Sequence, residues 1–154
     1  MAASTGDSDP DAIKAWYTGL LDKVVKEMVN IEAVSGVAVQ AAPLWMVQRE
    51  MLLAKVWAVG KESDFIWTLS IDKLIADYIA GSLASSPREA AKHFSLKWQM
   101  DADRLASVAQ GQSMGEKADK TLQDYSARLI EYAEALYNLT MRDEAWEEQQ
   151  SLAD

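Results

Sequence analysis

The sequence predicts a mainly α protein: a single compact domain of four principal helices with a short β element or hairpin near residues 65–80. Apolar residues recur at three- and four-residue steps over long segments, which is the spacing of one helix face. Two helix starts are marked by a capping residue followed by proline, at Asp9 and at Ser86. The chain has 154 residues, of which 49% are hydrophobic, enough for one buried core. An all-α helical bundle is the alternative.

The first helix is expected to begin after Asp9 and to end near Ala33. Asp9 can cap this helix, and Pro10 fits its first turn because no amide hydrogen is needed there. Gly19 interrupts the helix and is expected to allow a close contact. Its buried face is predicted to consist of Ile13, Trp16, Tyr17, Leu20, Val24, Met28 and Ile31.

A second helix is expected from Pro43 to about Val59, closed by Gly60. Its apolar side chains would cover most of the circumference and leave only a narrow polar strip. A helix that is apolar on most sides is usually the central one, so we expect the other helices to surround it.

Residues 64–79 fit two patterns. Alternate positions are aromatic or apolar, as in a strand, and the same stretch also carries a helical stripe. We expect a short β element at 65–70, followed by a turn. Residues 74–80 are then either a partner strand or a short helix that ends at Gly81.

The third helix is predicted to start at Pro87 and to run to about Ala109. Ser86 and Glu89 have the spacing of a capping box, in which each side chain bonds a backbone amide of the first turn. The buried stripe of this helix is expected to be Ala90, Phe94, Trp98, Ala102, Leu105 and Ala109.

A fourth helix is predicted to end near Thr140, with a final turn at 142–146. The domain would therefore span residues 9–146, between a flexible tail at 1–8 and an acidic tail at 147–154. Tryptophan side chains dominate local clusters, so most of the six are expected in the core. They are Trp16, Trp45, Trp57, Trp67, Trp98 and Trp146.

The net charge of the chain indicates which classes of binding partner are unfavourable. The net charge is −9 and the isoelectric point is near 4.6. Such a surface repels nucleic-acid phosphates and anionic lipid, so neither nucleic acid nor a membrane is expected as a partner. A basic protein or self-association fits better. The apolar segments are too interrupted for a transmembrane helix, and the absence of cysteine suits a reducing, cytoplasmic location.

The chemistry available to the chain is limited by its single histidine, His93. A zinc site with several histidine ligands and a ferritin-type di-iron site both need more histidines than the chain has. The glycine-rich loops that bind nucleotide phosphates are absent from the sequence, and so is the serine-nucleophile elbow. We therefore expect no metal, no cofactor and no catalytic residue.

One candidate polar cluster remains, and it consists of Asp72, Asp77, Tyr78, Arg88 and His93. Paired carboxylates can act as general acid and base when they lie in a cleft. A cation in the first turn of a helix is disfavoured by the helix dipole, so Arg88 is expected to pair with Asp72 or Asp77. His93 lies one turn after Glu89, and a local ion pair between them is the simpler explanation for both.

Several short segments between residues 43 and 146 form an ordered set of landmarks. They are Pro43-Leu44-Trp45, Trp57-Ala58-Val59, Trp67 with Ser70 and Asp72, Asp77-Tyr78-Ile79, Pro87-Arg88-Glu89-Ala90, Phe94 with Trp98, and Ala133-Glu134-Ala135-Leu136-Tyr137 leading to Trp146. This order resembles an uncharacterised family of short bacterial proteins, described only as a domain of unknown function. The resemblance implies a bacterial cytosolic protein with a short β element. It implies no activity and no catalytic residues.

Three hypotheses for function follow. The first is a non-enzymatic protein-interaction domain, for example an acidic neutraliser of a basic partner, as in toxin–immunity pairs; charge and abundant aromatics favour it. The second is a small-ligand-binding protein or enzyme that uses the Asp/Tyr/Arg cluster, which requires its side chains to converge on one pocket. The third is a structural or stress-related domain without a site.

Overall fold

The computed structural model describes residues 9–36, 38–47, 49–71, 75–111 and 116–147. The predicted tails at 1–8 and, except for Glu147, at 147–154 lie outside the described residues. The elements in chain order are α2 (Pro10–Asn30), β1 (Val39–Val47), β2 (Met51–Ala58), β3 (Ile66–Ile71), β4 (Ile75–Ala80), the 3-10 helix η2 (Gly81–Leu83), α3 (Pro87–Gly111), α4 (Glu116–Thr140) and α5 (Glu144–Glu147).

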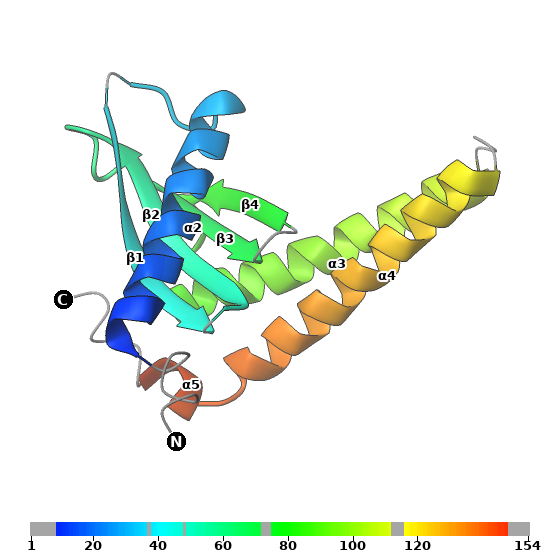
Figure 1. The fold of residues 1–154 in the computed structure, drawn as a ribbon. Helices are drawn as coiled ribbons and strands as arrows, with labels where there is room; N and C mark the ends of the chain where they lie inside the picture. The colour runs from blue at the N-terminus through cyan, green and yellow to red at the C-terminus, as the bar shows by residue number, and fades with distance from the viewer. Residues whose placement is uncertain (1–8, 37, 48, 72–74, 112–115, 148–154) are drawn as a thin grey trace.

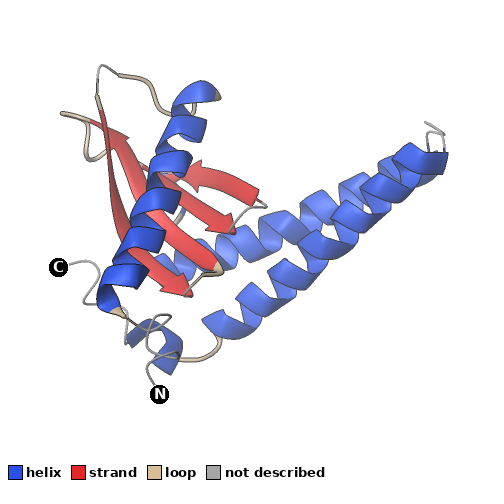
Figure 2. Cartoon of the chain, viewed as in Figure 1, coloured by secondary structure: helices blue, strands red, loops and turns tan. Residues whose placement is uncertain are grey.

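The fold is α+β, so the prediction of a mainly α domain or an all-α bundle is wrong. The four strands form one antiparallel sheet in the order β1-β2-β3-β4, with each strand beside its neighbour in sequence. Figure 2 shows this sheet between a helix on one side and a pair of helices on the other.

The helix predicted from Pro43 to Val59 is instead the second half of β1, a turn and β2. Both faces of this sheet are covered, so β2 is buried at nearly every position and its sequence does not alternate between apolar and polar. The turn also lacks the glycine or asparagine that usually marks a hairpin. Arg49 occupies the left-handed position there, with φ of 61°.

Pro43 lies within the edge strand β1 and does not begin a helix. Pro43 pairs with Ala54 and Trp45 pairs with Leu53, so one extra residue is inserted in β1 between them. Proline lacks an amide hydrogen, and such residues are tolerated in edge strands and at bulges. The proline is therefore a feature of this sheet edge.

The two faces of the sheet carry different helices. Helix α2 packs on the face that includes Val56 and Ala58, with Val34 from the segment after the helix. Helix α3 packs on the opposite face, where Leu53, Trp67 and Leu69 join its buried side chains in the main core. Figure 1 shows α2 in front of the sheet and α3 behind it.

The expected β element at 65–80 is confirmed as the β3–β4 hairpin, with Trp67 paired to Ile79 and Leu69 to Asp77. Of the two alternatives for 74–80, the partner strand is correct. Gly81 follows β4 directly, and a Cβ there would collide with the carbonyl oxygen of Phe65. The chain can leave β4 this close to β3 only because residue 81 is glycine.

The helix starts predicted at Asp9 and Ser86 are confirmed. Asp9 accepts a hydrogen bond from the amide of Asp11, and Ser86 Oγ accepts one from the amide of Glu89. Helix α2 ends at Asn30, a little before the predicted Ala33. The expectation for Gly19 is wrong, since nothing lies within 4 Å of the position of its missing Cβ.

Helices α3 and α4 form an antiparallel pair that continues beyond the sheet as a two-helix arm (Figure 1). The predicted stripe of α3 is confirmed at Ala90, Phe94, Trp98 and Ala102, which are fully buried. Three tryptophans, Trp45, Trp67 and Trp98, are also fully buried. The other three, Trp16, Trp57 and Trp146, are half-buried.

Candidate functional site

An open groove of about 710 Å³ runs between strand β4 and helix α3. Residues 77–80 of β4 form one wall, and the outward face of α3 from His93 to Arg104 forms the other, with Leu83 at one end. We call it the β4–α3 groove. Because β4 is the last strand of the sheet in the described part of the chain, this groove lies along a sheet edge.

The Asp77 carboxylate lines the groove and is fixed there by hydrogen bonds. Asp77 Oδ2 accepts hydrogen bonds from Lys97 Nζ at 2.7 Å and from Trp98 Nε1 at 2.9 Å. Asp77 Oδ1 accepts a third from the Tyr78 amide at 2.8 Å. Three donors therefore hold this carboxylate in place, and it joins the edge strand to α3.

A row of alternating charges extends from Asp77 along α3. Lys97 lies between Asp77 and Asp101, with its Nζ 3.6 Å from Asp101 Oδ2. Arg104 Nη2 is 3.6 Å from Asp101 Oδ1. Burial lowers the pKa of Lys97, but the hydrogen bond to Asp77 and the charges of Asp77 and Asp101 outweigh it, so the pKa lies above its ordinary value. Lys97 is therefore held as a cation.

Beside the charged row, the groove exposes apolar side chains of η2 and α3. Leu83, Leu96 and Met100 are 49%, 55% and 65% exposed, although each has a large apolar side chain. Leu96 and Met100 are four residues apart and share one face of α3. Exposed apolar residues that gather in one groove, and are not scattered, mark an interaction or ligand-binding surface.

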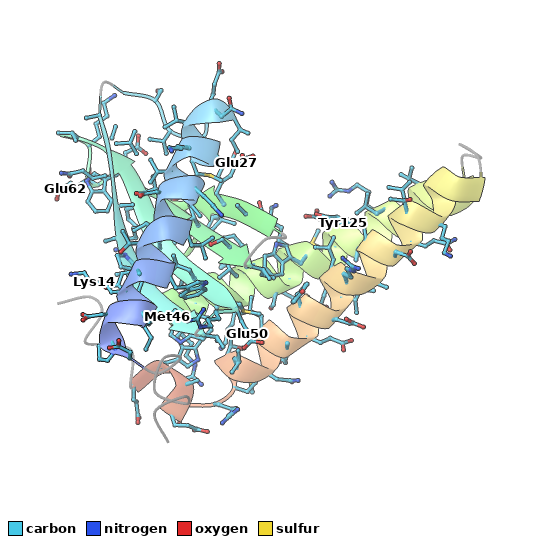
Figure 3. The ribbon with its side chains drawn as sticks, viewed as in Figure 1. Lys14, Glu27, Met46, Glu50, Glu62 and Tyr125 are labelled. Carbon is cyan, nitrogen blue, oxygen red and sulfur yellow. The ribbon has the colours of Figure 1, made fainter. Side chains whose placement is uncertain are left out.

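A second hollow of about 440 Å³ lies on the other side of the charged row. It is lined by residues of β4, α3 and α4, among them Ala76, Leu105 and Tyr125. Tyr125 of α4 is 45% exposed (Figure 3). The accessible surface thus continues from the sheet edge onto the arm.

The structure brings together three of the five residues of the predicted polar cluster. Asp77, Tyr78 and His93 all line the β4–α3 groove. Asp72 lies outside the described residues. Arg88 lies elsewhere: its Nε donates to the Thr140 carbonyl at 2.6 Å, and its Nη1 is 2.9 Å from Asp143 Oδ1. The predicted pairing of Arg88 with Asp77 is therefore wrong.

Glu89 takes part in the start of α3, as predicted, but its side chain bonds Ser85 and not Ser86. Its Oε2 accepts hydrogen bonds from Ser85, at 2.8 Å from the hydroxyl and 3.4 Å from the amide. These bonds to Ser85, and to a smaller extent the charges of His93 and Lys92, lower the pKa of Glu89. Glu89 thus completes the helix start one residue earlier than a standard capping box. His93 is left facing the groove.

Lys97, Asp101 and Arg104 line the groove but were not among the residues singled out from the sequence. Two signals were available. The charges alternate at four- and three-residue spacing, which places them on one helix face. Leu96 and Met100 repeat at the same spacing, outside the predicted buried stripe.

Two kinds of site are not found in the described part of the chain. Over residues 9–36, 38–47, 49–71, 75–111 and 116–147, no three acidic, histidine or cysteine side chains gather in a way that could hold a metal ion. Among the helices described, none is both long and apolar enough to cross a membrane.

The fold and groove define a small α+β domain: a four-stranded meander between one helix and a helical pair, with an apolar groove along its last strand. The chain belongs to the family described as Domain of unknown function (DUF4826), whose model matches residues 15–146. No curated protein and no solved structure matches the chain.

Proposed function

We propose that this chain is a protein-interaction domain that binds a basic protein partner through the β4–α3 groove. The observation that carries the proposal is the exposure of Leu83, Leu96 and Met100 in one groove beside a free sheet edge. Removing such side chains from water favours association by roughly 25 cal/mol for each Å² of apolar surface. The groove therefore offers a favourable free energy to a partner that covers it.

The charge of the molecule supports a basic partner. The chain carries −9 overall, so its long-range field attracts cations and repels a second copy of itself. Within the groove, the row from Asp77 to Arg104 offers carboxylates and cations at fixed positions. Such a row orients a partner, while the apolar residues supply affinity.

The proposal is compatible with an acidic, immunity-like neutraliser in the cytosol of a bacterium, since the cysteine-free sequence suits a reducing compartment. The hypothesis of a small-ligand enzyme required the predicted cluster to converge on one pocket. Arg88 instead bonds Thr140 and Asp143, and the three hydrogen bonds on Asp77 give that carboxylate a structural role. We therefore do not propose an enzymatic function.

Site-specific photo-crosslinking in cells of the source organism tests the proposal. A benzoylphenylalanine replaces Met100 in the groove or, as the matched control, Met141, which is 60% exposed beyond the end of α4. We expect a discrete adduct with a basic protein from position 100 and none from position 141. Adducts of equal yield from both positions, or none from position 100, would contradict the proposal.

A further inference from the structure

We infer that the partner binds as an extended segment that adds a fifth strand to the sheet along β4. This inference rests on the proposed function, because it specifies how a protein occupies the β4–α3 groove. Backbone groups on a free strand edge are a ready template for another strand, and a groove beside that edge can receive alternate side chains. Figure 1 shows β4 as the outermost strand, on the side from which the arm departs.

The pairing register identifies the free backbone groups. The amide of Gly81 donates to the Phe65 carbonyl at 3.0 Å, so residues 65 and 81 form a hydrogen-bonded pair. Antiparallel pairs alternate between bonded and non-bonded, and the register continues as Ile66 with Ala80. Every second residue of β4 therefore directs its N–H and C=O away from β3. These residues are Ala76, Tyr78 and Ala80.

The two edges of the sheet differ in how well they are protected. Strand β1 contains Pro43 and a bulge, both of which hinder pairing with another strand. Strand β4 contains neither proline nor an interruption of its register. The Asp77 side chain protects this edge from pairing with another strand, because its Oδ1 accepts a hydrogen bond from the Tyr78 amide at 2.8 Å. Among the described residues, the central outward N–H is the one covered in this way.

The hydrogen bond from the Tyr78 amide to Asp77 indicates which side chains the partner segment needs. A side chain opposite Asp77 lies on the α3 side of the sheet, because cross-strand neighbours share a face. A lysine or arginine there can bind Asp77 and release the Tyr78 amide for the new strand. The side chain two residues away lies opposite Ile79, near Leu83 and Leu96. The geometry therefore favours an extended segment with one basic and one apolar residue in alternate positions.

A second copy of the chain is a weaker occupant. Two chains would pair their β4 strands around Tyr78, where the amide of each is already bonded to its own Asp77. Each copy also carries −9, which opposes association. A basic, extended segment of another protein is attracted by the net charge, and its basic side chain can displace Asp77 from the Tyr78 amide.

The full chain, immobilised and panned against a phage library of random linear dodecapeptides, provides the probe. We expect recovered peptides to carry alternating apolar and basic residues. The synthetic peptide with the strongest consensus is then titrated against Ala80→Pro and, as the matched control, Ala80→Val. Ala80 has φ of −60°, which proline adopts without strain, and its N–H points away from β3.

The proline removes one outward donor, so we expect the peptide to bind about tenfold more weakly to Ala80→Pro and within about twofold of wild type to Ala80→Val. A peptide that binds both variants equally, but loses binding in Leu96→Glu, overturns strand addition and leaves groove docking intact. Failure to recover any peptide with the expected pattern, or self-association through β4 on sedimentation, also overturns it.

If Ala80→Pro does not fold, hydrogen exchange of the wild-type chain decides the question. The outward amides of Ala76 and Ala80 should exchange rapidly in the free protein and at least about tenfold more slowly with the peptide bound. No slowing at either amide would overturn strand addition.

Discussion

Asp77 is the residue on which the groove depends. Its carboxylate accepts hydrogen bonds from the Trp98 indole in the buried core, from the Lys97 ammonium in the charged row and from the Tyr78 amide at the sheet edge. Trp98 is fully buried, so its indole N–H would be costly to leave without an acceptor. One side chain therefore couples the stability of the core to the shape of the surface.

The Asp77–Lys97 pair makes a specific contribution to the pH dependence of stability. The pKa of Lys97 is raised in the folded protein, so its contribution is complete below the ordinary value of 10.5 and is lost as pH rises through the folded pKa. In Asp77→Asn, which keeps an oxygen for Trp98 but removes the charge, the attraction is absent. We expect the free-energy difference between wild type and this variant to be constant from pH 7 to about pH 10 and to shrink above it.

Urea unfolding measured across that pH range checks this prediction. A difference that stays constant through the titration of lysine would contradict the assignment of the raised pKa to Asp77.

Arg88 fixes the end of α4. It reaches across to the Thr140 carbonyl and to Asp143, just before α5. Hydrogen bonds of a charged donor are worth roughly 1.5–3 kcal/mol, so Arg88→Ala should lower the free energy of unfolding by about 2 kcal/mol. Arg104→Ala is the control, because Arg104 is 71% exposed and has one ion pair at 3.6 Å. That variant should lose less than about 0.5 kcal/mol in urea unfolding; equal losses would contradict the account.

At the scale of single elements, α2 ends in a Schellman motif with an unusual residue. The amide of Ala33 bonds the Met28 carbonyl and that of Glu32 bonds the Val29 carbonyl. Glu32 has φ of 62°, a conformation that favours glycine. The position where a helix of this kind usually ends in glycine is thus occupied by glutamate in this sequence.

Replacing Glu32 with glycine should raise the free energy of unfolding by about 0.5–1 kcal/mol, because glycine adopts a positive φ without steric cost. Glu27→Gly, inside the same helix, should lower it by about 1 kcal/mol. Thermal or urea unfolding of both variants makes the comparison. A loss of stability in Glu32→Gly would show that the glutamate side chain matters more than its backbone conformation.

The elements that sequence reasoning predicted correctly are those with local signals. Capping residues at Asp9 and Ser86 mark α2 and α3, and alternation marks β3. The β1–β2 hairpin could not be predicted in this way. Burial of β2 on both faces removes its alternation, and Arg49 stands where a turn would normally show glycine or asparagine.

Only part of the candidate site was predicted, because some of its contacts also lack a local signal in the sequence. Asp77, Tyr78 and His93 are conspicuous polar or aromatic residues, and the structure brings them to one groove. Arg88 bonds to a segment 52 residues later in the chain, a contact that no local spacing signals. The exposed pair Leu96 and Met100 becomes informative only when the opposite face of α3 is known to be the buried one.

At the scale of the whole molecule, the sheet and the two-helix arm differ in the contacts that stabilise them. The shared core includes Ala102 of α3 and Leu129 of α4, and Figure 1 shows both helices continuing past the sheet. Between residues 120 and 128 of α4, Ser126 is the one buried side chain, and it bonds the Ala102 carbonyl at 2.8 Å. The described part of the arm is therefore supported mainly by the pairing of its two helices.

Native-state hydrogen exchange should reveal this difference. Amides of β2 and β3 should exchange only on global unfolding, whereas amides at 120–125 should exchange through local opening at a free energy at least about 2 kcal/mol lower. Equal opening free energies in both regions would mean that the arm and the sheet unfold as one unit.

The central claim is that the β4–α3 groove binds a protein. The most direct measurement is the affinity of the protein crosslinked at position 100 for Leu96→Glu and for Val29→Glu. Both place a carboxylate at an exposed apolar position, one in the groove and the other on α2, where Val29 is 45% exposed. The account predicts a Kd at least about tenfold higher for Leu96→Glu and within about twofold of wild type for Val29→Glu. Equal Kd values for the two variants would contradict it.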